Sequence, residues 1–106
     1  MITSNIQTNL LNKNWSSDPN SNKAVMFVFK QTKLHVYSNG NEIGYEDYYL
    51  TDKDSTFKDS DIGSVSSGNY IKTRRLTYII EFYSDFKKFR IRAKNSSKWQ
   101  DYYLLN

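Results

Sequence analysis

The back half of the chain is a succession of short runs rich in aromatic and β-branched residues. Only a few turn residues separate these runs, which cover 70–71, 76–83, 89–93 and 99–105. Many of them alternate apolar and polar side chains, the period of a half-buried strand, and none has the spacing of an amphipathic helix. Sequential strands joined by tight turns predict an antiparallel meander that closes or packs on itself.

The front half continues this pattern. We expect strands over 24–30, 33–38 and 42–50, preceded by a helical turn and a short strand at 10–15. Asn39-Gly40 predicts a tight hairpin because both residues tolerate positive φ, and Gly44 suggests a bulge or a bend of a barrel. The chain is therefore expected to form a single domain of about eight strands over 1–106, with a loose leader at 1–9 and a long loop at 51–68.

Composition supports an all-β domain and excludes several classes of function. Alanine, the best helix former, occurs only at positions 24 and 93, and 106 residues suffice for a single core. The absence of cysteine excludes disulfides and thiolate chemistry. The net charge is only +4, and acidic residues are interspersed with the basic ones, which indicates a charge that favours solubility rather than a nucleic-acid-binding surface. No apolar run has the length of a transmembrane segment.

The start of the sequence bears on location. Residues 1–11 are polar and contain no apolar stretch of the kind that a secretion signal needs. We therefore expect a cytoplasmic protein for the sequence as written. A periplasmic or lipoprotein-derived location stays open if a leader has been removed.

Several motifs follow one another in an order that resembles small lipocalin-like domains of the Bacteroidetes type. They are the entry turn with Trp15, Phe27-Val28-Phe29-Lys30 leading into 33–37, Asn39-Gly40, and the segments 48–52, 62–63, 66–71 and 78–82. The resemblance implies an eight-stranded up-and-down barrel with one end plugged by the N-terminal turn. Many relatives resemble exported lipoproteins, with a leader and a lipidated cysteine that this sequence lacks. The family implies a shape and little chemistry.

A barrel of eight strands is either filled by its own side chains or holds one small ligand. The side chains expected inside are Val25, Phe27, Phe29, Leu34, Val36, Tyr78, Ile80, Phe82, Phe89, Ile91 and Trp99. Because most are bulky, a solid interior with a shallow cup at one end is the favoured interpretation. Such a cup would hold a small apolar or aromatic ligand, and the expected ligand-binding residues are Tyr45, Tyr49, Tyr70 and Trp99.

Basic residues of the back half suggest a second function. Arg90 and Arg92 share one strand face, opposite Phe89 and Ile91. Outward basic residues could solvate the barrel wall, bind an acidic protein partner, or, least favoured, bind single-stranded nucleic acid. The expected partner-binding residues are Arg74, Arg90, Arg92 and Tyr70. A protein of this kind would be an immunity or inhibitor protein that binds an acidic toxin or enzyme through its outer basic and aromatic face or through the loop at 51–68.

No catalytic, cofactor or metal site is expected. His35 has no second histidine or cysteine to work with, so a solvated surface histidine is the favoured interpretation. The acids of 52–61 lack the spacing of a helix-loop-helix calcium site and are interpreted as solvated loop residues. Glu46, Asp47 and Glu81 are interpreted as ordinary strand acids. We therefore expect a non-catalytic binding protein.

Overall fold

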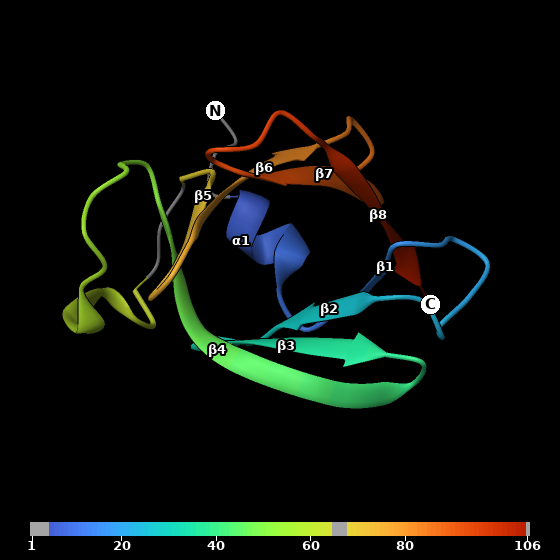
Figure 1. Cartoon of the computed structure of the whole chain (residues 1–106). Helices are drawn as coiled ribbons and strands as arrows, with labels where there is room; N and C mark the ends of the chain where they lie inside the picture. Colours follow the sequence, from blue (N-terminus) through green and yellow to red (C-terminus); the bar gives the residue numbers. More distant parts are fainter. Residues whose placement is uncertain (1–4, 65–67, 106) are drawn as a thin grey trace.

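Eight antiparallel strands form a closed barrel in the computed structural model, which describes residues 5–64 and 68–105 (Figure 1). The strands are β1 (Asn14–Ser16), β2 (Met26–Phe29), β3 (Lys33–Ser38), β4 (Asn41–Thr51), β5 (Tyr70–Thr73), β6 (Thr77–Phe82), β7 (Lys88–Ala93) and β8 (Gln100–Leu105). Each strand pairs with the next along the chain, and β8 returns to pair with β1. The prediction of an all-β up-and-down barrel with a short N-terminal helix is confirmed.

The hairpin and bulge signals in the sequence correspond to real features. Asn39 and Gly40 have φ of 55° and 82° and join β3 to β4, as expected for a tight turn. In the same pair of strands, Val36 pairs with Gly44 while Tyr37 pairs with Glu42. One extra residue, Ile43, therefore bulges from β4 next to Gly44, and the bulge sets which β4 side chains point inward.

A short helix, α1 (Asn5–Leu10), lies within one end of the barrel (Figure 1). It begins inside the segment 1–9, where we expected a loose leader, and residues 1–4 lie outside the described residues. The indole Nε1 of Trp15 donates a hydrogen bond to the Leu10 carbonyl oxygen at 3.0 Å. The backbone N–H of Asn12 donates to the Phe29 carbonyl at 2.8 Å. These bonds fasten α1 to the barrel, and we call this end the closed end.

Aromatic rings fill the closed end. The Trp15 ring lies edge-on to Phe89 and Phe82, with centroids 4.9 and 5.6 Å apart. Phe29 lies between Phe89 and Tyr48 at 6.4 and 5.5 Å. Edge-to-face pairs of this kind add about 0.5–1.5 kcal/mol each to the stabilisation from burial. Among the described residues, no buried side-chain nitrogen or oxygen lacks a hydrogen-bond partner.

The barrel interior contains most of the side chains expected there. Phe29, Leu34, Ile80, Phe89 and Ile91 are buried, and Phe27, Val36, Tyr78 and Phe82 pack partly buried against them. The expected set missed several core residues, which are Leu10, Trp15, Tyr48, Leu50, Ile71 and Tyr102.

Two of the expected inward residues lie elsewhere. Val25 precedes the start of β2 and is 38% exposed. Trp99 precedes β8, where Tyr102 and Leu104 point inward, so its position along the strand is an outward one. Its ring instead lies against the guanidinium groups of Arg90 and Arg92. The inward placement of Val25 and Trp99 was therefore wrong.

Candidate binding site

The barrel interior is hollow at the end opposite α1, which we call the open end. A cup of about 250 Å³ lies there, and its lining residues are Phe27, Leu34, Val36, Glu46, Tyr78, Ile91, Arg92, Ala93, Lys98, Gln100 and Tyr102. The strands that fill the closed end also build this cup. Strand β2 contributes Phe29 to the closed end and Phe27 to the cup, and β6 contributes Phe82 to the closed end and Tyr78 to the cup. The cup is therefore part of the rigid barrel and not of a loop.

Aromatic and aliphatic side chains form the wall of the cup. The rings of Phe27 and Tyr102 stack with centroids 4.5 Å apart. Burial raises the pKa of Tyr102 to about 12. The pKa of Tyr78 is also raised, first by burial and then by the negative charge of Glu46. Both phenols are therefore neutral at physiological pH, and each brings a hydroxyl group to an otherwise apolar surface.

One carboxylate points into the cup from β4. Glu46 pairs across the strands with Leu34, whose side chain is in the core, so both side chains lie on the inner face. The Glu46 side chain is 29% exposed, and its nearest cation is the Arg75 guanidinium, with Nη2 3.6 Å from Oε1. That separation is too long for a hydrogen bond, and the Arg75 side chain is 79% exposed. An ion pair with so exposed an arginine contributes little.

The rim of the cup is formed by the turn between β7 and β8. Arg92 holds this turn in place, because its Nη1 donates hydrogen bonds to the carbonyl oxygens of Lys94 and Ser96 at 3.1 and 2.8 Å. The same guanidinium lies 5.1 Å from the centre of the Trp99 ring. Lys98 and Gln100 complete the rim and are exposed.

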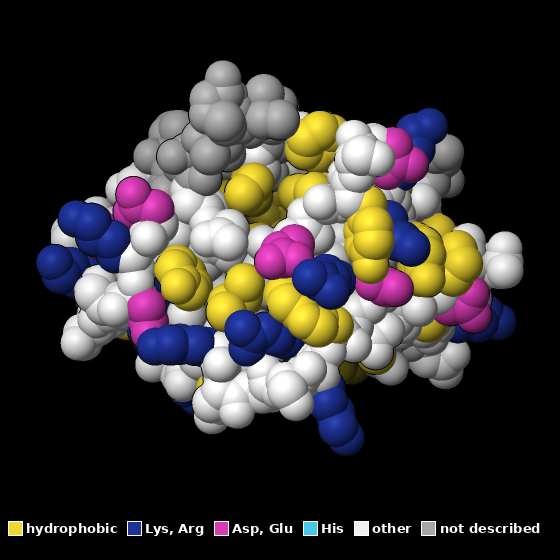
Figure 2. Space-filling view, turned by 90° about the horizontal axis from the view of Figure 1, so that it is seen from above, with side chains coloured by type: hydrophobic (Ala, Val, Ile, Leu, Met, Phe, Trp, Pro, Cys, Tyr) yellow, Lys and Arg dark blue, Asp and Glu magenta, His cyan; other side chains and the backbone are white. Residues whose placement is uncertain are grey.

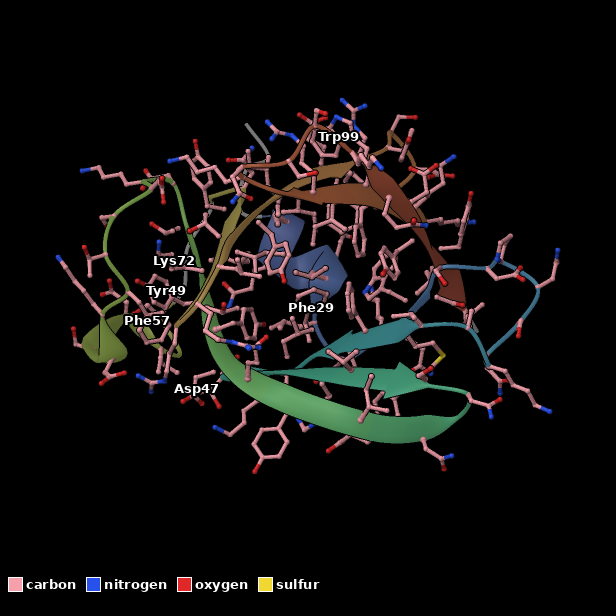
Figure 3. The ribbon with its side chains drawn as sticks, viewed as in Figure 1. Phe29, Asp47, Tyr49, Phe57, Lys72 and Trp99 are labelled. Atoms are coloured by element: carbon pink, nitrogen blue, oxygen red, sulfur yellow. The ribbon has the colours of Figure 1, made fainter. Side chains whose placement is uncertain are left out.

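The four residues predicted to bind a ligand are not brought together at the cup. Tyr45 pairs with His35 on the outer wall and is 59% exposed. Tyr70 occupies an outward position on β5, since its neighbour Ile71 is in the core. Tyr49 and Trp99 also lie outside the ring of strands (Figure 3). Whether any of the four contacts a ligand stays a prediction.

The loop that follows β4 covers Tyr49. The Phe57 ring lies 5.2 Å from the Tyr49 ring, and the backbone N–H of Lys58 donates to the Tyr49 hydroxyl at 3.0 Å (Figure 3). Arg74 lies over Phe57 at 4.8 Å and donates to Asp59 at 2.6 Å and to Asp47 at 3.0 Å. Of the residues predicted to bind a partner, Arg74 therefore fastens this loop to the barrel wall.

A second set of contacts fastens the start of the same loop. The Asp54 carboxylate accepts hydrogen bonds from Lys94 and, at 3.4 and 3.3 Å, from Lys72 and Thr77. The bond from Lys94 is the main reason that the pKa of Asp54 lies below its ordinary value of 3.8. Farther along, Gly68 approaches the Thr51 backbone so closely that an added Cβ would lie 1.9 Å from it. The sequence offers Phe57, Ile62 and Val65 as the apolar anchors of this loop, and Val65 lies outside the described residues.

Arg90 and Arg92 lie on the outer wall over β6 to β8. In this wall, aromatic side chains alternate with basic and acidic ones, as the face in Figure 2 shows. Arg90 donates from Nε and Nη2 to Glu81 at 2.8 and 2.6 Å, and its guanidinium lies 4.0 Å from the Trp99 ring centre. Nearby, Lys88 lies 4.2 Å from the Tyr83 ring and 5.4 Å from the Tyr103 ring. In this wall Arg90 is therefore paired with an acid, whereas Lys88 and Arg92 lie against aromatic rings.

The remaining candidate residues are accounted for by nearby side chains. His35 lies on the outer wall with Nδ1 3.0 Å from Glu42 Oε1. Asp54 and Asp59, interpreted from sequence as solvated, are paired with basic side chains. The described residues contain no cluster of three or more histidine and acidic side chains that could hold a metal ion. Within the same part of the chain, no helix has the length and apolar character needed to cross a membrane.

Two residues of the cup, Glu46 and Tyr102, were not predicted from the sequence to lie inside the barrel. Glu46 was interpreted as an ordinary strand acid, and Tyr102 was left out of the interior. Glu46 has the same parity along β4 as the core residues Tyr48 and Leu50. That signal could have identified its inward position.

The fold and the cup together define a small closed antiparallel barrel with one hollow end. The sequence matches no protein-family model, and comparison with curated proteins and with solved structures also finds no match.

Proposed function

We propose that the protein is a non-catalytic, lipocalin-like binding module that holds a small apolar or aromatic ligand in the cup at the open end. The observation that carries this proposal is the cup itself, about 250 Å³ within the barrel, with an apolar wall and a few polar groups. Ligand sites are typically concave, mostly apolar and equipped with a few oriented polar groups. The cup volume lies slightly below the range of about 300–1,000 Å³ typical of such sites, which favours a ligand of about one ring.

The chemistry of the lining supports binding rather than catalysis. Glu46, Tyr78 and Tyr102 are its acidic side chains, and burial raises the pKa of both tyrosines. General acid–base or nucleophilic catalysis needs a nucleophile with an adjacent base, or an acid and a base matched to the working pH. A single carboxylate beside two neutral phenols provides neither pair. The same groups can orient a ligand by hydrogen bonds.

The test is a titration followed by amide NMR shifts, with 2-phenylethanol as a neutral one-ring probe. The amides of Phe27, Val36 and Ile91 should shift. Val36→Trp should fill the cup and abolish these shifts, while Tyr45→Trp on the outer wall should leave them unchanged. Shifts confined to the outer wall, or shifts that survive Val36→Trp in a folded protein, would contradict the proposal.

The outer wall favours a second candidate function, an immunity- or inhibitor-type protein that binds an acidic protein partner. The observation behind it is the half-buried Trp99 ring that lies against the guanidinium groups of Arg90 and Arg92, since tryptophan and arginine dominate binding energy at protein interfaces. Steering by these arginines would make partner binding weaker in salt. A partner isolated from native lysate should be lost by Trp99→Ala and retained by Val36→Trp.

A further inference from the structure

We propose that Glu46 makes the cup selective for a ligand that carries a cationic amine on a small aromatic or aliphatic body. This inference rests on the proposed function of the cup and adds the chemical class of its ligand. Glu46 is the acid among the lining residues of the cup, where it lies on the inner face beside Leu34. The other charged lining residues, Arg92 and Lys98, belong to the rim.

Among the described residues, Arg75 is the one cation at ion-pair distance from the Glu46 carboxylate, and Lys33 and Arg74 border a neighbouring surface pocket that Glu46 also lines. The Glu46 side chain is mostly removed from water and shares the cup with Leu34, Val36 and Tyr78. A carboxylate in such a place costs free energy unless a cation or hydrogen-bond donors accompany it. Arg75 lies 3.6 Å away at the end of an exposed side chain, so it compensates weakly and can move aside. A ligand amine entering the cup would supply the missing partner.

The remaining wall suits the same ligand. An ammonium group near Glu46 could also lie against the Tyr78 ring, because aromatic faces attract cations. The stacked rings of Phe27 and Tyr102 offer a flat surface for the body of the ligand. A hydroxyl in place of the amine would keep these apolar contacts but not the ion pair.

The rim does not reverse this preference. Arg92 is occupied by carbonyl oxygens and by the Trp99 ring. Lys98 is exposed, so water and salt screen its charge. An anionic group placed inside the cup would meet the Glu46 carboxylate, and like charges in a partly dry site repel strongly.

Three probes that share one phenyl body test the inference: 2-phenylethylammonium, 2-phenylethanol and 3-phenylpropanoate. Their dissociation constants are measured by NMR titration at low salt. We expect the ammonium probe to bind about tenfold more tightly than the alcohol. Glu46→Gln should remove that preference, so that the dissociation constants of the two probes become about equal within the variant. The matched control, Glu81→Gln, removes an outer-wall carboxylate and should leave the preference intact.

The outcomes separate this inference from the proposed function. If the alcohol binds in the cup but the ammonium probe binds no more tightly, the selectivity is wrong and the cup remains a binding site. A preference for the propanoate would assign selectivity to Lys98 and also overturn the role of Glu46. If none of the probes shifts the cup amides, the proposed function itself fails. Because the ratio of affinities is taken within one variant, small changes in stability do not affect it.

Discussion

The two ends of the barrel are built by the same strands and differ in what fills them. At the closed end, Trp15, Phe29 and Phe89 interlock under α1, and the Trp15 indole donates a hydrogen bond to the Leu10 carbonyl oxygen. At the open end, the same strands leave a cup and turn the Glu46 carboxylate into it. The difference indicates that one end holds the fold together and leaves the other free to vary. The proposed ligand site and the most tightly packed part of the core thus lie at opposite ends of the barrel.

Replacing one phenylalanine at each end is the most severe test of this comparison. Phe89 is fully buried against Trp15, Phe29 and Phe82, so Phe89→Ala should lower the free energy of unfolding by about 3–5 kcal/mol. Phe27 at the open end is only partly buried, and Phe27→Ala should cost about 1–2 kcal/mol. Urea unfolding followed by circular dichroism measures both. Equal losses would mean that the two ends contribute alike to stability.

Glu46→Leu tests whether the open end is adapted for stability. The substitution replaces a poorly compensated carboxylate with an apolar side chain beside Leu34 and Val36. We expect the free energy of unfolding to rise by about 0.5–1 kcal/mol while the preference for the ammonium probe disappears. A Glu81→Leu control breaks the outer ion pair with Arg90 and should bring no gain. Destabilisation by Glu46→Leu would show that the carboxylate is part of the scaffold.

Tyrosine ionisation distinguishes the two ends without altering the stability at neutral pH. Burial raises the pKa of Tyr48 at the closed end and raises that of Tyr102 to about 12. The folded protein therefore favours the neutral phenols. Their stabilisation is complete below pH 10 and is lost as pH rises through the folded pKa values. Phenolate absorbance should show Tyr102 ionising near pH 12 and Tyr48 ionising only when the barrel unfolds. Tyr102→Phe should remove the former step. Ionisation of Tyr48 while the protein is still folded would contradict the tight packing of the closed end.

The fold could be predicted from sequence because its signals are local. Alternating runs identify strands, Asn39-Gly40 identifies a hairpin, and Gly44 indicates a bulge. All of these follow from the backbone preferences of neighbouring residues. A short N-terminal helical turn was predicted near residue 10. The helix α1 begins earlier, at Asn5, and this start was missed because its sequence, Asn-Ile-Gln-Thr-Asn-Leu, is short and polar and carries no clear start signal. Its stability comes from contacts with the barrel rather than from its own propensity.

The cup depends only in part on local patterns, such as the shared parity of Glu46, Tyr48 and Leu50 along β4. The inward position of Glu46 follows from a bulge at Ile43, and a shift of one residue exchanges the two faces of a strand. The outward position of Trp99 likewise depends on where β8 begins. The expected ligand residues were chosen by their aromatic character, and the structure places Tyr45 and Trp99 on the outer wall. Strand parity, fixed only by long-range pairing, decides which rings can reach the cup.

The ring of strands closes through its shortest strand, β1, which pairs with β8. Asn14 pairs with Leu105, Trp15 with Leu104 and Ser16 with Tyr103. Of the eight described strands, β1 is synthesised before all the others and gains its second neighbour only when β8 has been made. Until then the ribbon has two unpaired edges, which can associate with other chains. Joining such distant segments is also slow, because the entropy of closing a long loop must be met first. Closure is thus the step at which folding and aggregation compete.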